Sequence, residues 1–139
     1  MKRIKEGFFC MSENSFKQQY EVLLIKAKQD LVLVEQVINN TDVANEIKYF
    51  HLQQGVEKAL KSLLCFKGIQ FPKTHDLEDM IDLAGENHVR LPDSMNLLAE
   101  LTPYAVEFRY ALVFDSLHEP EYYLERVREF IKFVENTFK

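Results

Sequence analysis

Helix-breaking residues are scarce in this chain, which has four glycines and four prolines among its 139 residues. The chain also has no low-complexity run and no internal repeat. These absences leave little room for a flexible linker or a second domain. A chain of this length can bury a sufficient core without disulfides or a structural metal. We therefore expect a single domain that needs no cross-link.

Cysteine is scarce as well: Cys10 and Cys65 are the two cysteines, and their spacing does not match a metal site. Cys65 falls in a stretch with helical periodicity, where a free thiol acts as a small apolar side chain. A free thiol at this position weakly favours a reducing compartment.

Long apolar runs are missing too, because no stretch approaches the roughly 18 apolar residues needed to span a bilayer. Residues 7–11 are apolar and follow basic residues, but they are too few for a signal peptide. We therefore expect a soluble, cytoplasmic protein without a membrane partner. The net charge of −5 argues against indiscriminate binding to phosphate backbones, while a focused basic site stays compatible with it.

The common catalytic motifs are absent. The chain has no glycine-rich phosphate loop, no Gly-x-Ser-x-Gly and no His-Glu-x-x-His. Its histidines are scattered, with no pair at the four-residue spacing of helical metal ligands: His51, His75, His88 and His118. The sequence thus predicts neither a metal site nor a cofactor.

What is present is helical periodicity along most of the chain, with no stretch that alternates as a strand would. Thr102-Pro103 should kink or interrupt the fourth helix. Residues 1–14 should form a loosely held arm, in which Met11 is an alternative start, and residues 15–139 should form an all-α bundle. The predicted helices run from Phe16 to Ile38, from Thr41 or Asp42 to Gly68, from Thr74 to Ala84, from Ser94 to Leu112 and from Pro120 to Phe138.

Several residues should define the ends of these helices. Ser15 is placed to cap the first helix, Thr41 or Asp42 the second, and Thr74 the third. Gly68 suits the left-handed position after a helix, and Pro120 suits the first turn of the last one. The first two helices, joined by a few residues, should form an antiparallel hairpin.

The second predicted helix has a polar band beside its apolar stripe. Gln53, Glu57 and Lys61, with Gln54, fall in one band when residues are placed about 100° apart on a helix. One interpretation is a solvated edge held by local pairs, and the other is a functional row. His75 should help to close the turn before the third helix.

Residues 104–123 are the other candidate region, because Arg109, Tyr110 and His118 lie there among apolar residues. A histidine can move a proton to or from a ribose hydroxyl, while a guanidinium holds a phosphate with two hydrogen bonds. This chemistry would cleave a phosphodiester without metal. The alternative is a structural arginine paired with Glu107 or Glu57.

Three segments together resemble the HEPN family, the "higher eukaryotes and prokaryotes nucleotide-binding" domain. They are the residues from Gln53 to Lys61 followed by Gly68, the segment FPKTHDL at 71–77, and Tyr104, Ala105, Glu107, Arg109 and Tyr110. The resemblance covers residues 15–138. It implies an up-and-down four-helix bundle with a short additional helix, commonly a homodimer.

Small HEPN proteins resemble partners of minimal nucleotidyltransferases, often in toxin–antitoxin pairs, and some branches are metal-independent ribonucleases. The resemblance therefore implies a nucleotide-binding module with such a partner, in which Arg109 and Tyr110 contact nucleotide or phosphate. Because the second and fourth helices of an antiparallel bundle can face each other, we expect Glu57 to orient Arg109, while Gln53 and Lys61 line the same nucleotide-binding groove. The alternative is a ribonuclease toxin with Arg109 on the phosphate and His118 as acid and base. Eight residues separate these two, more than in the ribonuclease branches. Alanine and leucine also follow Tyr110, where another branch has proline and aspartate.

Overall fold

The computed structural model describes residues 13–106 and 117–139, and every regular element within these ranges is helical. The all-α prediction is confirmed. The elements are α1 (Glu13–Val37), α2 (Asn45–Phe66), α3 (Leu77–Glu86), α4 (Met95–Leu98), the 3₁₀ helix η1 (Ala99–Val106) and α5 (Pro120–Thr137). None of these helices is both long enough and apolar enough to cross a membrane.

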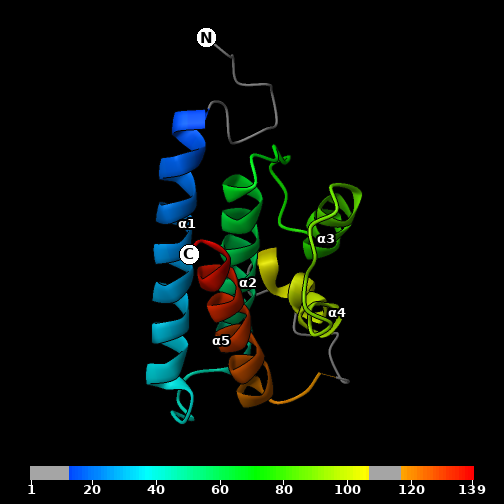
Figure 1. Cartoon of the computed structure of the whole chain (residues 1–139). Helices are drawn as coiled ribbons and strands as arrows, with labels where there is room; N and C mark the ends of the chain where they lie inside the picture. The colour runs from blue at the N-terminus through cyan, green and yellow to red at the C-terminus, as the bar shows by residue number, and fades with distance from the viewer. Residues whose placement is uncertain (1–12, 107–116) are drawn as a thin grey trace.

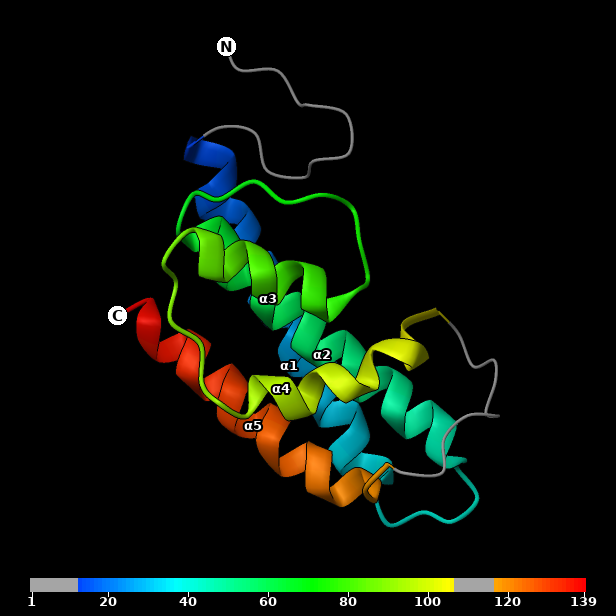
Figure 2. The same cartoon turned by 90° about the vertical axis from the view of Figure 1, so that its right-hand side faces the viewer.

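Helix α2 occupies the centre of the fold. It runs antiparallel to α1, and α5 packs beside both, while α3 and α4 lie on the opposite side of α2 from α1 (Figures 1 and 2). Because α2 has neighbours around it, its apolar residues Leu52, Val56 and Leu60 are each no more than 1% exposed. The second helix of the predicted hairpin is therefore the central helix of the fold.

The fourth member of the predicted bundle is less regular than the periodicity suggested. It begins as the single-turn helix α4 and continues as η1, which contains Pro103. Proline lacks a backbone donor and disfavours an α-helical residue before it, so the expected interruption takes the form of a 3₁₀ helix. Residues 107–112 of this predicted helix lie outside the described residues.

The helix ends confirm some sequence predictions and correct others. Gly68 has φ +73° after α2, and Pro120 is the first residue of α5, both as predicted. Helix α1 begins at Glu13, so Ser15 lies within it rather than capping it. The residue before α2 is Ala44, not Thr41 or Asp42, and it makes no side-chain cap.

The start of α3 also differs from the prediction. Asp76 is the capping residue, and its Oδ1 accepts from the backbone N–H of Glu78 at 2.9 Å. Thr74 instead forms the turn before the cap, where its Oγ1 accepts from the N–H of Asp76 at 3.0 Å. Two consecutive side-chain turns therefore fix the chain that leads into α3.

Cys65 is fully buried near the end of α2, as its helical position predicted. It is a disulfide cysteine, however, so the interpretation of a free thiol was wrong. The residue to which it is bonded lies outside the described residues. The weak support that a free thiol gave to a reducing compartment is removed.

Candidate functional site

A row of four side chains spaced four residues apart runs along α2: Tyr49, Gln53, Glu57 and Lys61. Residues at this spacing lie above one another on one helical face. Gln53 is 0% exposed and Glu57 is 4% exposed, so the polar band is not a solvated edge. A buried amide and a buried carboxylate are stable only if hydrogen-bond partners surround them.

Glu57 has partners on both carboxylate oxygens. Its Oε1 accepts from the Gln53 amide at 3.1 Å, and its Oε2 accepts from the Lys61 ammonium at 3.0 Å. The ring Nδ1 of His75 lies 3.1 Å from Oε1 and 3.2 Å from Oε2. No side-chain polar atom buried in the described part of the chain lacks a partner. Glu57 is therefore the acceptor around which three donors are arranged.

Gln53 and Glu57 also fasten the segment 69–76 to α2. The Gln53 amide nitrogen donates both to Glu57 and, at 3.2 Å, to the backbone carbonyl of His75. Gln53 Oε1 accepts from the amide of Gln54 at 2.8 Å. His75 is thus held through its ring and its backbone, and the residues just before it are placed beside Lys61.

A cavity of about 310 Å³ lies at this junction. Leu23 and Phe71 supply its apolar wall, and Glu57 lies at its inner side. Three lysines also line the cavity: Lys58 and Lys61 from α2, and Lys73 from the segment before α3. Thr74 and His75 of that segment complete the lining. The Lys61 ammonium also lies 5.7 Å from the centre of the Phe71 ring.

A second ion-pair cluster supports the same wall from α1. Asp30 of α1 is 8% exposed, and its Oδ2 accepts from Lys58 at 2.7 Å. Its Oδ1 lies 2.9 Å from Nδ1 of His51. Asp30 packs against α2 at Gly55, where an added Cβ would lie 3.8 Å from the Cβ of Asp30, an ordinary van der Waals contact.

Tyrosines gather at the other end of the row. Tyr49 donates to the backbone carbonyl of His118 at 2.7 Å, and Tyr123 donates to Glu100 at 2.8 Å. The Tyr123 oxygen in turn accepts from the N–H of His118 at 3.4 Å. The His118 ring lies 4.1 Å from the Tyr122 ring, centre to centre. The fold therefore holds the backbone of His118, while its side chain is exposed.

The family comparison matches the HEPN domain over residues 20–137. This chain belongs to the HEPN family. The match supports a role connected with nucleotides or RNA, and it extends over the row of α2, the segment 69–76 and α5. Comparisons with curated proteins and with solved structures find no match.

In this HEPN domain, three of the residues singled out from the sequence come together, namely Gln53, Glu57 and Lys61. The backbone of His118 is bonded to Tyr49. Tyr49 precedes Glu57 by eight residues, which places the two residues about 12 Å apart along the helix axis. Arg109 and Tyr110 lie outside the described residues, so the proposed pairing of Glu57 with Arg109 is not tested. Among the described residues, no group of acidic, histidine and cysteine side chains could hold a metal.

Sequence reasoning missed the role of His75 and the whole cluster of Asp30, His51 and Lys58. His75 was expected to close the turn before α3, but its ring also pairs with Glu57 from eighteen residues away. The signal that could have found it is the position of Gln53 and Glu57 at the edge of an apolar stripe, because buried polar groups require donors from elsewhere.

The tyrosine cluster of the HEPN domain should give the stability a pH dependence at high pH. Burial, and then nearby Glu119, raise the pKa of Tyr49 from 10.0 to about 12. The folded state therefore holds this proton more tightly, so the stability contributed is complete below pH 10.0 and is lost as pH rises towards about 12. Burial, and then the hydrogen bond to Glu100, raise the pKa of Tyr123 in the same sense.

Urea denaturation between these pH values should show the decline. The Tyr49→Phe protein should be less stable near neutral pH, because it lacks the bond to His118, and it should lose less stability as pH rises. Tyr122→Phe, a change outside the hydrogen-bonded cluster, is the matched control. Equal slopes for wild type and Tyr49→Phe would contradict the assignment.

Proposed function

We propose that this HEPN domain is a nucleotide-binding module, with the phosphate held in the cavity between α2 and the segment 69–76. The observation that carries the proposal is the cavity itself, where Lys61 of α2 and Lys73 of the following segment line the same space. The HEPN match supports a nucleotide- or RNA-related role in general. Because lysines line the cavity, we assign that role to the binding of a phosphate group.

The charges around the cavity favour an anion. Lys58, Lys61 and Lys73 face it, and the carboxylates paired with them are Asp30 and Glu57. Lys73 has no carboxylate partner among the described residues and is exposed. One positive charge is therefore left over, which a bound phosphate would neutralise.

Lys61 can bind phosphate without leaving Glu57. An ammonium group has three N–H donors, and the bond to Glu57 uses one of them. The Lys61 side chain is 13% exposed, so its remaining donors are directed by the pair rather than free to move in solvent. Glu57 then orients Lys61, in addition to any role that it has toward Arg109.

The other proposed contacts divide into two groups. Gln53 is 0% exposed, so we assign it to holding Glu57 and His75 in place rather than to touching the nucleotide. Arg109 and Tyr110 stay as proposed phosphate contacts, outside the described residues. His118 is needed only by the ribonuclease alternative, in which it would exchange the proton while Arg109 holds the phosphate.

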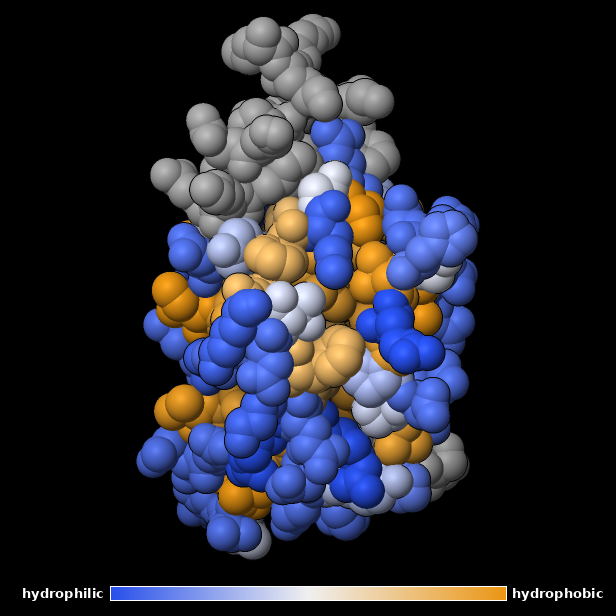
Figure 3. All heavy atoms as spheres, viewed as in Figure 1, coloured by the Kyte–Doolittle hydropathy of each residue, from blue (hydrophilic) through white to orange (hydrophobic). Residues whose placement is uncertain are grey.

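The partner in this proposal is a minimal nucleotidyltransferase, as in a toxin–antitoxin pair, with a second copy of the chain forming a homodimer. The support is the resemblance of residues 53–61, 71–77 and 104–110 to HEPN proteins of that kind. Helix α1 also exposes four large apolar side chains, Val22, Ile25, Val32 and Leu33. Figure 3 shows hydrophobic patches between hydrophilic side chains along the side where α1 lies.

Isothermal titration calorimetry with AMP, ATP and inorganic phosphate tests the proposed site. The Lys61→Ala/Lys73→Ala protein should bind the best of these ligands at least about tenfold more weakly, because it loses two charge-assisted hydrogen bonds. Lys26→Ala removes an exposed lysine from α1 and is the matched control. Absence of binding by the wild type, or equal losses in both variants, would refute the phosphate site.

The same preparation distinguishes the ribonuclease alternative. Incubation with single-stranded and transfer RNA in EDTA should leave the RNA intact if the domain is a binding module. Metal-independent cleavage that disappears in Arg109→Ala and His118→Ala would instead establish the enzyme. Cleavage that persists in both variants would point to a contaminating nuclease.

A further inference from the structure

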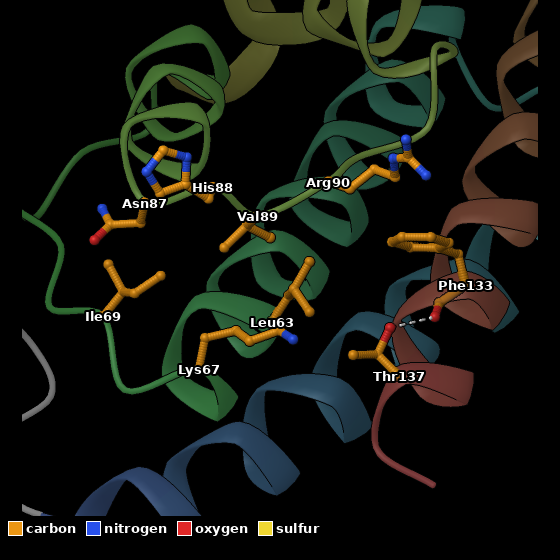
Figure 4. A pocket seen from close by; sticks show the side chains of 9 residues that line it. All are labelled: Leu63, Lys67, Ile69, Asn87, His88, Val89, Arg90, Phe133 and Thr137. Carbon is orange, nitrogen blue, oxygen red and sulfur yellow. Dashed lines mark hydrogen bonds between the residues drawn. The ribbon is translucent and has the colours of Figure 1, made fainter.

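A second cavity, of about 480 Å³, lies at the opposite edge of α2 from the proposed phosphate site, and no residue lines both. Its walls come from the C-terminal end of α2 and the residues just after it, the segment after α3 and the last turns of α5 (Figure 4). A cavity of this size is large enough for a small organic ligand.

Apolar side chains form one part of the lining of this second cavity, beside polar and basic residues. Leu63 is 1% exposed at its base, and Ile69, Val89 and Phe133 are partly buried side chains packed against the core. Figure 4 shows Val89 above Leu63 at the middle of the cavity, with the Phe133 ring to one side. An apolar surface of this kind can take the body of a ligand out of water.

The charged residues of the lining are all basic. Lys67 and Arg90 are exposed, and neither has a carboxylate partner among the described residues. No acidic residue lines the cavity, although the chain as a whole carries a net charge of −5. Two cations without carboxylate partners beside these apolar side chains favour a ligand that carries negative charge.

The two cations hold different positions. In Figure 4 the Lys67 side chain lies along the base of the cavity below Leu63, while His88 turns away. Arg90 and Phe133 line the same cavity. A guanidinium stacks on planar rings, whereas an ammonium is a compact charge that suits a phosphate or carboxylate. Arg90 and Phe133 therefore fit a planar ring, and Lys67 fits an anionic group attached to it.

Two uncharged polar side chains, Thr137 and Asn87, also line the cavity. The Thr137 hydroxyl donates to the carbonyl of Phe133 at 3.0 Å, which leaves its oxygen available as an acceptor. The Asn87 side-chain nitrogen donates to the carbonyl of Leu83 at 2.9 Å, which leaves its Oδ1 available as an acceptor in the same way. A ligand with ring N–H or O–H donors would find acceptors at both positions.

We propose that this cavity is a second binding site, which takes a small organic anion made of a planar ring and one phosphate or carboxylate group. The site does not depend on the phosphate site of Lys61. Its two cations lie on the surface, so replacing them should leave the fold unchanged, and the loss of one charge-assisted hydrogen bond should weaken binding about tenfold.

Titration of the ¹⁵N-labelled protein with phenyl phosphate, benzoate, benzyl alcohol and inorganic phosphate tests this site. Phenyl phosphate or benzoate should shift the amide resonances of Lys67, Val89 and Phe133, and the stronger of the two identifies the anionic group. Benzyl alcohol and inorganic phosphate, which each have one half of the required chemistry, should bind at least about tenfold more weakly.

Variants separate the two cavities. Lys67→Ala and Arg90→Ala should each weaken the binding of phenyl phosphate or benzoate, while Lys61→Ala/Lys73→Ala should leave it unchanged. The proposal is overturned if neither ring-bearing anion shifts these resonances, or if binding survives in both Lys67→Ala and Arg90→Ala. A protein that fails to bind nucleotides but keeps this pattern would refute the first site alone.

Discussion

Replacing Glu57 with alanine should lower the free energy of unfolding by about 3 kcal/mol, because it removes the only carboxylate in contact with Gln53, Lys61 and His75 among the described residues. The cost arises mainly from the groups that remain. The Gln53 amide is 0% exposed, and its nitrogen keeps only the bond to the His75 carbonyl. Lys61 is left with a buried stem and an unpaired charge. Urea denaturation monitored by circular dichroism measures the change.

Two further variants identify the cause of that loss. Glu57→Gln keeps the shape, but its amide presents a donor where the carboxylate accepted from Lys61 or His75, so its cost should be intermediate. In a double-mutant cycle, Glu57→Ala and Lys61→Met should be less than additive, because the second change removes the unpaired ammonium. Additive losses, or a Glu57→Ala effect below about 0.5 kcal/mol, would show that the network does not stabilise the fold.

The polar row of α2 was predictable from the sequence, but its partners were only partly so. Lys61 lies one helical turn after Glu57, and this pair follows from the periodicity alone. His75 reaches the same carboxylate through the path of residues 69–76, which periodicity does not define. The requirement that a buried carboxylate have donors says that a partner exists without saying which residue it is.

The start of α2 is a second feature that the sequence alone did not predict. Thr41, Asp42 and Asn45 are all residue types that can cap a helix, and local preference does not choose among them. In the structure the Asn40 side chain accepts from the N–H of Asp42 at 2.9 Å, which forms a turn at these residues. Helix α2 therefore begins only at Asn45. Gly68 and Pro120 were predicted correctly because glycine adopts a positive φ without steric cost, whereas proline has a fixed φ that suits the first turn of a helix.

Truncation of Leu60 should have a stability cost as large as that of Glu57. Leu60 is 0% exposed on the central helix, and Leu60→Ala should lower the free energy of unfolding by about 2–5 kcal/mol through lost burial and the cavity left behind. Leu60 lies next to Lys61 in α2 but is not part of the cavity lining. Urea denaturation gives the cost, and calorimetry with nucleotide gives the binding of the fraction that stays folded.

The comparison of Leu60→Ala with Glu57→Ala separates stability from function. Both proteins should be destabilised, but folded Leu60→Ala should keep its affinity for nucleotide, because Lys61 and Lys73 are still held by Glu57 and the His75 segment. Folded Glu57→Ala should lose affinity, because Lys61 is no longer oriented. Equal affinities in the two variants would mean that the network stabilises α2 without positioning a phosphate contact.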